Sequence, residues 1–376
     1  MKRIFSLVVI LLIICGLIWV SCQKKVEEKV VKIGAVLVLT GPNAKAGQSA
    51  KQGIEMAVEE INASGGVKSR KIKVIYEDDG GEPQKSVSAV QKLINVDKVL
   101  AILGPMWSSC VLAVAPIVES KGVVILSPTA SSPKITYAGD YIFRNTYSDA
   151  IEGAKTAEFA SKELKYGKAG ILFINNDYGV GLKDAFKRKF EELGGKIVID
   201  EGYDPKTTDF RTILVKVKER SPEVIYIAGY SEMGQLLRQM RETGIKIPVL
   251  SCIMFEISDI AKVAGKAAEG VIYAYPSYDP EKGNEITLKF AKKFKEKYGT
   301  LPDPEAAFSY DAVKILALAM ERGGFTSEDI KNALYKIKGY NGITGKTSFD
   351  ENGDVIKPVG FKRVHNGKYE WLKLEY

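Results

Sequence analysis

The chain contains a single histidine, His365, among its 376 residues. This scarcity excludes a metal site built on several histidines, and the position of His365 in a predicted hairpin turn argues against a catalytic triad. Two short matches to enzyme motifs also fail. Gly345-Lys346-Thr347 follows Tyr340 where a phosphate-binding loop requires glycine, and Ser131-Ser132-Pro133-Lys134 lacks the S-D-N and K-T-G companions of β-lactamases. We predict a protein that is not an enzyme and uses no cofactor or metal.

Cysteine is also scarce, with four residues in the whole chain. Cys15 and Cys22 belong to the N-terminal segment discussed below, which leaves Cys110 and Cys252 in the folded part. One disulfide between them is the alternative to two free thiols. Because the two residues fall in different predicted α/β units, where a bridge would lock the units together, we expect two buried thiols.

The chain lacks a cluster of arginines and any mixed aromatic and basic motif, although its net charge is +8. Its lysines alternate with acidic residues along amphipathic segments such as residues 289–299, which is typical of a solvated helix face. We therefore expect no binding to nucleic acid. With 45% hydrophobic residues and no long low-complexity tract, the chain is typical of a globular protein.

The N-terminus carries the pattern of an exported protein. Lys2 and Arg3 precede an apolar run over residues 4–20, as in a secretory signal, with a retained membrane anchor as the alternative. Residues 19–22, Trp-Val-Ser-Cys, resemble a bacterial lipobox, although Trp19 stands where leucine is preferred. We predict a signal peptide over residues 1–21, lipidation of Cys22, and a charged tether over residues 22–31 that holds the protein at the membrane.

From residue 32 onward, short apolar segments rich in β-branched residues alternate with amphipathic helical segments, which indicates parallel sheets with crossover helices. A first set of predicted strands ends at residue 128, and a second set starts at residue 169. The predicted strands are residues 32–40, 71–79, 99–105, 123–128, 169–174, 196–203, 224–230, 248–252 and 271–276. The sequence therefore predicts two α/β units.

Three segments set the expected lobe boundaries. Residues 140–149 carry no strand or helix signal and mark the first crossing, and Pro276-Ser277 marks the second. The helical pattern over residues 305–324 rejoins the first lobe, and the tail alternates with period two around two Asn-Gly turns, as antiparallel strands do. We assign residues 32–147 and 277–340 to lobe 1, and residues 148–276 and 341–376 to lobe 2.

In open parallel sheets a ligand binds at the loops that follow the carboxyl ends of the strands. One such loop ends in Trp107, Ser108 and Ser109, directly before a helix whose free N–H groups would suit a carboxylate. Another contains Thr129 and Ser131. Capping of the helix is the alternative role for the serines. In the second unit Tyr178 and Tyr230 stand at corresponding positions, where ordinary packing is the alternative.

Taken together, seven segments resemble the branched-chain amino acid binding proteins of ABC transporters, from about Lys32 to the C-terminus. They are IGAVLVLTGPNAKAGQSAKQGIEMAVEEINASGG, DDGGEPQKSVSAVQKLI, ILGPMWSS, LSPTASSP, NNDYGVGL, GYSEMGQLLRQMRETG and AFSYDAVK. The resemblance implies a periplasmic-binding-protein type I fold, whose two doubly wound lobes are joined by three crossings. It also implies that Ser108, Thr129 and Ser131 bind the ligand carboxylate, and that Tyr178 and Tyr230 cover the ligand.

The chain departs from the family pattern at two positions that bear on the ligand. Ala46 stands where the family has an aromatic residue, and Ile253 stands where it has an acid for the ligand ammonium. We expect Asp149, at the lobe crossing, or else Glu256 to replace that acid, and Trp107 beside the carboxylate loop to reshape the pocket. The expected function is an extracytoplasmic solute-binding lipoprotein, monomeric, that delivers an amino acid to an ABC permease. The alternative is a sensor of the same fold for an amide or small carboxylate.

Overall fold

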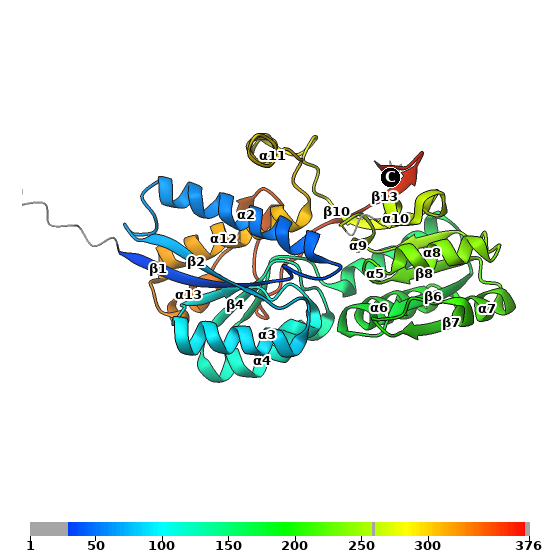
Figure 1. Cartoon of the computed structure of the whole chain (residues 1–376), viewed down its shortest axis with the longest axis horizontal. Helices are drawn as coiled ribbons and strands as arrows, with labels where there is room; N and C mark the ends of the chain where they lie inside the picture. Colours follow the sequence, from blue (N-terminus) through cyan, green and yellow to red (C-terminus); the bar gives the residue numbers. More distant parts are fainter. Residues whose placement is uncertain (1–28, 258–259, 373–376) are drawn as a thin grey trace, which may run out of the picture.

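The computed structural model describes residues 29–257 and 260–372, which form two α/β lobes arranged along the long axis of the molecule (Figure 1). The predicted signal peptide, Cys22 and most of the predicted tether lie outside the described residues. The tether ends earlier than predicted, because Val30 and Val31 already pair with Lys71 and Ile72 in the first sheet. Within the described ranges, no helix is both long enough and apolar enough to cross a membrane.

The first lobe is built on a parallel sheet of five strands in the order β2-β1-β3-β4-β5. Alternate residues of a central strand face opposite layers, so Ile33 and Ala35 of β1 join one core and Val36 joins the other. The strands are β1 (Val30–Leu37), β2 (Lys71–Asp78), β3 (Ala101–Leu103), β4 (Val124–Ser127) and β5 (Ile142–Arg144).

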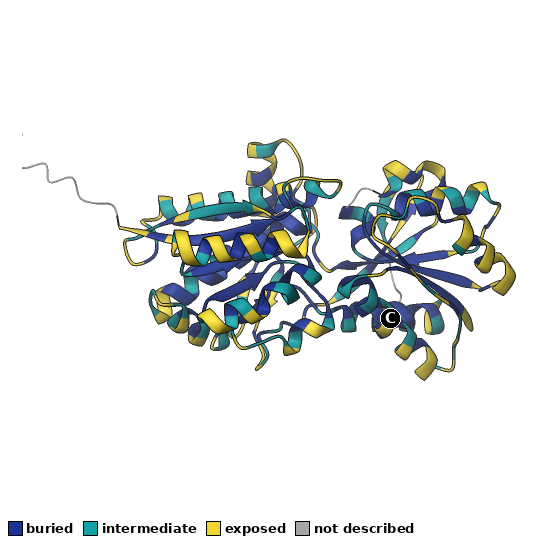
Figure 2. Ribbon diagram, turned by 60° about the horizontal axis from the view of Figure 1, so that its bottom comes forward, coloured by how far each residue is buried: buried dark blue, intermediate teal, exposed yellow. Residues whose placement is uncertain are grey.

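Helices cover both faces of this sheet, with α2 packed on α12 and α3 packed on α4 (Figure 1). The helices are α2 (Ala44–Ala63), α3 (Pro83–Lys92), α4 (Ser108–Lys121), α11 (Glu285–Tyr298), α12 (Pro304–Gly323) and α13 (Ser327–Tyr335). Buried residues concentrate on the strands, and exposed residues lie on the outer helix faces (Figure 2).

The second lobe contains a sheet of seven strands in the order β14-β13-β10-β9-β8-β6-β7. Its strands are β6 (Lys168–Ile174), β7 (Lys196–Tyr203), β8 (Val224–Ala228), β9 (Val249–Ser251), β10 (Ile272–Pro276), β13 (Val359–His365) and β14 (Lys368–Trp371). Its helices are α5 (Asp149–Glu158), α6 (Asp177–Glu192), α7 (Arg211–Arg220), α8 (Met233–Glu242), α9 (Met254–Ile257) and α10 (Ile260–Ala264).

The two lobes repeat one topology. The parallel order β7-β6-β8-β9-β10 matches β2-β1-β3-β4-β5 strand for strand, and the antiparallel pair β13–β14 extends the second sheet beyond β10. In each lobe the strand order reverses at one point, between β1 and β3 or between β6 and β8, where open sheets of this type place their ligands. The predicted pair of doubly wound α/β lobes is therefore confirmed.

The crossings between the lobes differ in detail from the sequence-based expectation. Residues 140–149 contain a strand, β5, which pairs with β4, so the first crossing is confined to residues 145–148. The assignment of residues 341–376 to lobe 2 needs correction for its first part. The hairpin of β11 (Tyr340–Gly342) and β12 (Gly345–Thr347) lies against α12, where Asp311 accepts hydrogen bonds from the amides of Ile343 and Thr344 at 3.0 and 2.9 Å. Among the described residues of this segment, β13, β14 and the adjoining Leu372 join lobe 2.

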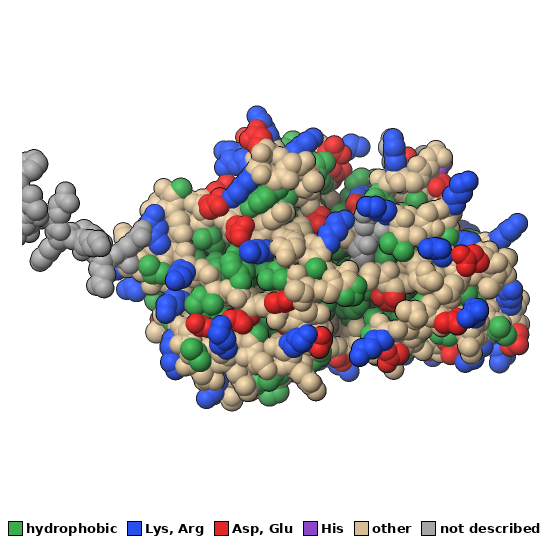
Figure 3. All heavy atoms as spheres, viewed as in Figure 1, with side chains coloured by type: hydrophobic (Ala, Val, Ile, Leu, Met, Phe, Trp, Pro, Cys, Tyr) green, Lys and Arg blue, Asp and Glu red, His purple; other side chains and the backbone are tan. Residues whose placement is uncertain are grey.

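The cysteines and the surface charge agree with the sequence analysis. Cys110 in α4 and Cys252 after β9 are buried free thiols in different lobes, and burial raises the pKa of each to about 12. Basic and acidic side chains alternate over the visible face without a large patch of one sign (Figure 3).

Candidate ligand-binding site

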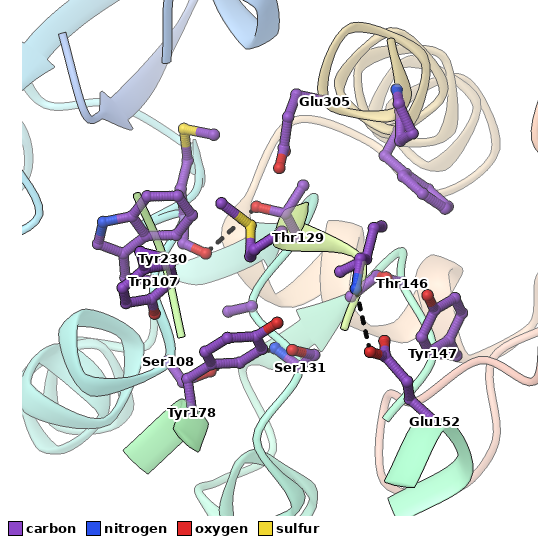
Figure 4. Close-up of a pocket in the computed structure, with 16 residues that line it drawn as sticks. Trp107, Ser108, Thr129, Ser131, Thr146, Tyr147, Glu152, Tyr178, Tyr230 and Glu305 are labelled. Atoms are coloured by element: carbon purple, nitrogen blue, oxygen red, sulfur yellow. Dashed lines mark hydrogen bonds between the residues drawn. The ribbon is translucent and has the colours of Figure 1, made fainter. Parts of the chain in front are cut away.

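A pocket lies between the lobes, at the loops that follow the carboxyl ends of the strands (Figure 4). Its cavity volume is about 30 Å³, against the roughly 10–15 Å³ that one water requires. The residues that line it are Met106, Trp107, Ser108, Thr129, Ala130, Ser131, Thr146, Tyr147, Glu152, Tyr178, Tyr230, Ile253, Met254, Pro304, Glu305 and Phe308. Six of the predicted site residues are in this set: Trp107, Ser108, Thr129, Ser131, Tyr178 and Tyr230.

Ser108 begins helix α4 and connects the two hydroxyl-rich loops of lobe 1. Trp107 occupies the N-cap position, and its side chain makes no capping hydrogen bond. The Ser108 hydroxyl instead accepts hydrogen bonds from the backbone amides of Ser131 and Ser132, at 3.3 and 3.1 Å. The first turn of α4, whose N–H groups have no partner within the helix, thus opens onto the pocket beside Ser131. This arrangement suits an anion.

Arg144, at the end of β5, supports the loop that contains Ser131 and Ser132. It is fully buried, and its Nη1 donates to the carbonyl oxygens of Ser131 and Ser132 at 3.0 and 2.9 Å. Its Nη2 forms an ion pair with Asp354 at 2.5 Å. Because a buried guanidinium offers five fixed donors, it can hold two carbonyls and a carboxylate at once. The hydroxyl loop is therefore rigid before any ligand arrives.

Three aromatic rings form a continuous stack that joins the lobes. Trp107 of lobe 1 stacks on Tyr230 of lobe 2 with centroids 4.9 Å apart, and Tyr230 stacks on Tyr178 at 5.1 Å. Trp107 fits there because residue 81 is glycine. A Cβ atom at Gly81 would lie 2.4 Å from the Trp107 indole nitrogen, and its φ of +76° also favours glycine. The two predicted tyrosines thus flank the pocket, as Figure 4 shows.

Glu152, on the first turns of α5, supplies a buried carboxylate from lobe 2. Its Oε1 accepts a hydrogen bond from the Ile253 amide at 3.2 Å, whereas its Oε2 has no hydrogen-bond partner among the described residues. Burial raises the pKa of Glu152 to about 8, and the nearby Asp149 carboxyl adds to this rise. A carboxyl in this state gains most from a cationic partner, because such a partner compensates its loss of hydration.

Glu305, on the first turn of α12, supplies a second buried carboxylate from lobe 1. Only 1% of its surface is exposed, and its Oε2 likewise has no partner among the described residues. Burial raises the pKa of Glu305 well above its usual range, Asp303 adds to the rise, and the Thr129 hydroxyl opposes it. Figure 4 shows Glu305 and Glu152 on opposite sides of the pocket.

Asp149, our first choice for the acid, does not line the pocket. It is the first residue of α5, and its amide donates to the Ser131 carbonyl at 2.8 Å. Its carboxyl is turned towards α6, since a Cβ at Gly181 would lie 3.4 Å from Oδ2. Burial raises the pKa of Asp149 to about 7. Glu152 lies three residues later on nearly the same face of α5, and this advance of almost one turn along the helix axis brings it to the pocket in place of Asp149.

Glu256 and Ala46 also lie away from the pocket, which corrects two further predictions. Glu256 accepts hydrogen bonds from Lys362 at 2.8 and 2.9 Å and from the Tyr273 hydroxyl at 2.5 Å, beside a separate hollow that Trp371 also lines. Lys362 belongs to β13, whose pairing with β10 was not predicted, so this ion pair could not be expected from the sequence. Ala46 is buried near the start of α2.

The sequence analysis missed several lining residues, notably Thr146, Tyr147, Glu152 and Glu305. Thr146 and Tyr147 are part of the first crossing, and a crossing that faces the cleft was the signal used for Asp149. If the same reasoning had been extended from the crossing to the whole first turn of α5, it would have included Glu152. Glu305 follows Pro304 at a helix start, but only the return of α12 to lobe 1 brings it to the pocket.

The lobes are also joined directly at the pocket edge. Asp177, at the start of α6 in lobe 2, accepts hydrogen bonds from the Ser109 hydroxyl and from Lys134 Nζ of lobe 1, each at 2.8 Å. These two contacts lower the pKa of Asp177, against the effect of its partial burial. Together with the aromatic stack they hold the two lobes closed over the pocket.

Comparisons with known proteins identify the family. A family model described as periplasmic binding protein matches residues 30–368. The Leu/Ile/Val-binding protein homolog 1 of Brucella suis is 29% identical over 350 residues, which cover 91% of this chain and 93% of that protein.

Two solved structures have the same architecture. The leucine-binding protein of Thermotoga maritima is 32% identical, with a TM-score of 0.86 and coverage of 92% of this chain and 98% of that one. A branched-chain amino acid transporter substrate-binding protein of Streptococcus pneumoniae, in complex with isoleucine, is 30% identical, with a TM-score of 0.84 and coverage of 91% and 98%. These matches confirm the type I two-lobed fold and a binding role in place of catalysis. The chain belongs to the periplasmic binding protein family.

Proposed function

We propose that the protein is an extracytoplasmic solute-binding component of an ABC importer that holds an α-amino acid in the pocket and passes it to a membrane permease. One observation carries the proposal. The pocket has anion-binding groups at the start of α4 and a buried carboxyl group, Glu152, on the opposite lobe, one of whose oxygens has no hydrogen-bond partner among the described residues. This is the complement of a zwitterion, and proteins named for branched-chain amino acids match nearly the whole chain.

In this proposal the ligand carboxylate lies at the N-terminus of α4, beside the hydroxyls of Ser108, Thr129 and Ser131. The positive end of the helix dipole and the free N–H groups compensate its charge. The ligand ammonium pairs with Glu152. Because both charged groups lose their water when the lobes close, each must find a partner, the carboxylate on lobe 1 and the ammonium on lobe 2, and this requirement couples binding to closure.

The lipid anchor is part of the same proposal. Export by the N-terminal signal and acylation of Cys22 would place the two lobes of the monomeric protein near the membrane permease. Replacing Cys22 with Ser is expected to abolish labelling by a radioactive or clickable fatty acid in cells. Persistent label on Cys22→Ser would contradict the anchor and leave the pocket assignment untouched.

A comparison of three related ligands tests the pocket assignment. We expect leucine-like or other free α-amino acids to stabilise the purified chain, by about 2.7 kcal/mol at a hundredfold excess over Kd. The matched N-acetyl amino acid, which lacks the ammonium, and the matched amine, which lacks the carboxylate, should each bind at least tenfold more weakly in calorimetry. Equal affinity for either analogue would contradict the assignment of that subsite.

A further inference from the structure

The pocket contains one more acidic group than a zwitterionic amino acid requires. If Glu152 pairs with the ammonium, Glu305 remains as a second carboxyl that is 1% exposed and has an oxygen without a hydrogen-bond partner among the described residues. The two carboxyls come from different lobes and lie on opposite sides of the pocket (Figure 4). They therefore approach a bound ligand from different directions.

The acidic and basic residues that line the pocket indicate what kind of group would pair with Glu305. Two glutamates line it, and the described lining residues include no lysine, arginine or histidine. A zwitterion has one ammonium, which pairs with one of the two carboxyls and leaves the other without a cationic partner. A buried carboxyl oxygen without a hydrogen-bond partner is costly, and this cost falls when a donor or cation reaches it.

The remaining wall of the pocket is also suited to a cation. Five aromatic rings line it, those of Trp107, Tyr147, Tyr178, Tyr230 and Phe308. Aromatic faces attract ammonium and guanidinium groups, and the attraction strengthens where water is excluded. An aliphatic side chain of the ligand would pack against these rings but could not form a hydrogen bond with Glu305.

We propose that the ligand is an α-amino acid whose side chain ends in a cationic group, which Glu305 and the aromatic wall hold together. This inference rests on the proposed function, because it assumes that the ligand backbone occupies the α4 and Glu152 subsites. It assigns to Glu305 the selection of the side chain.

Isosteric ligand pairs test the inference on the unmodified protein. 2,4-Diaminobutyrate and norvaline differ by an ammonium in place of a methyl group, and ornithine and norleucine differ in the same way. Calorimetry with the purified full chain should show that the cationic member of at least one pair binds about tenfold or more tightly than its apolar partner, as expected for a hydrogen bond to a charged group. Asparagine and glutamine are titrated beside them as neutral donors.

The variant Glu305→Gln assigns the preference to one residue. It should reduce the preference for the cationic member about tenfold or more and leave the affinity for norvaline within about threefold of the wild type. The control Glu285→Gln removes an exposed glutamate from the first turn of a neighbouring helix, α11, and should leave both affinities unchanged. Circular dichroism melts of both variants verify that they are folded.

The outcomes separate this inference from the proposed function. If norvaline or norleucine binds as well as its cationic partner, or if a neutral amide binds more tightly, the cationic side-chain subsite is overturned and the amino-acid function stands. The subsite is also overturned if Glu305→Gln retains the full preference. If no α-amino acid binds at all, the proposed function fails, and the inference fails with it.

Discussion

The two lobes share one strand order but contribute different chemistry to the pocket. The wall from lobe 1 is largely satisfied without a ligand. The Ser108 hydroxyl accepts two backbone amides, and Arg144 holds the carbonyls of the next loop. The wall from lobe 2 is not, because the hydroxyl of Tyr178 and one oxygen of Glu152 have no partner among the described residues. Lobe 1 also has buried atoms without a partner among the described residues, notably one oxygen of Glu305 and the Nε of Arg144.

This difference shows that two lobes of one topology can form different walls of a binding site. One wall is held by its own hydrogen bonds, and the other has polar atoms that pair only with the ligand. Satisfied polar networks are rigid and have one arrangement, whereas unsatisfied buried groups raise the free energy of the closed state until a ligand pairs with them. We infer that the ligand binds lobe 1 first and that lobe 2 closes over it. The following variants test this comparison, from the largest expected effect to the smallest.

The largest effect is expected from Arg144→Met, which removes the support of the lobe 1 loop. Asp354 would lose its ion-pair partner, and two buried carbonyls would each lose one of their donors. We expect the free energy of unfolding to fall by about 3–5 kcal/mol. Chemical denaturation measures it. The control Arg363→Met disrupts an exposed pair with Glu370 and should cost under about 1 kcal/mol. Equal losses would show that the loop does not depend on Arg144.

Glu152→Gln removes the responsive group of lobe 2. We expect amino-acid binding to weaken by about 1.5–3 kcal/mol, because a charge-assisted hydrogen bond is lost. Asp149→Asn is the matched control on the same helix and should retain affinity, since its carboxyl lies outside the pocket. Calorimetry compares the two. Loss of binding in Asp149→Asn alone would restore Asp149 as the ammonium partner.

The same variant changes the pH dependence of the ligand-free protein. The folded state retains the Glu152 proton up to about pH 8, whereas the unfolded state releases it near 4.5. The free energy of unfolding should therefore fall as pH rises between these values, by up to about 1.4 kcal/mol per unit from this group. Glu152→Gln should lose this contribution, which urea denaturation at a series of pH values measures. An unchanged slope would show that Glu152 ionises freely.

Ser108→Ala tests the rigid wall at one atom. The hydroxyl faces the pocket and also accepts the amides of Ser131 and Ser132, so two effects are expected together. Ligand affinity should fall by about 1–3 kcal/mol, and the ligand-free protein should also lose about 1–3 kcal/mol of stability. Calorimetry measures the change in ligand affinity, and thermal melts measure the change in stability of the ligand-free protein. A loss of stability with unchanged affinity would reduce Ser108 to a structural role.

The smallest effect is expected from Asp177→Asn, which weakens the contact between the lobes. Its partners Ser109 and Lys134 are partly exposed, so the contact should contribute no more than about 1 kcal/mol. We expect a slightly larger radius of gyration without ligand, measured by small-angle scattering, and compaction on saturation. Asp184→Asn, on the exposed side of the same helix, is the control. A radius that does not change with ligand would contradict closure.

The sequence predicted the architecture well because its signals are local. Short apolar strands alternate with amphipathic helices in both lobes, and each predicted parallel strand is present. The hydroxyl loops were also predictable, because a loop that follows a parallel strand lies at the edge where ligands bind. Ser108, Thr129 and Ser131 therefore line the pocket, as expected. The Asn-Gly turn at Asn366 likewise connects antiparallel strands, β13 and β14.

The acidic groups were not predictable in the same way. The choice between Asp149 and Glu152 depends on where α5 is placed along its axis against its neighbours, and the direction of Glu256 depends on the pairing of β13 with β10. Two residues three apart share a helix face but lie almost one turn apart along the axis, so they contact different neighbours. The boundary of the lobes near residue 341 depends on Asp311, which binds a hairpin more than thirty residues later in the chain.

The sequence by itself determined the two α/β lobes, the loops that meet between them, and the hydroxyl and aromatic groups of the site. These features follow from residue periodicity and from the position of a loop at a strand end. The tertiary structure alone decided which carboxylates face the pocket, that Glu305 returns from a distant helix to join it, and that Arg144 fixes the rigid wall. These features arise from contacts between segments far apart in the chain, and local periodicity carries no information about such contacts.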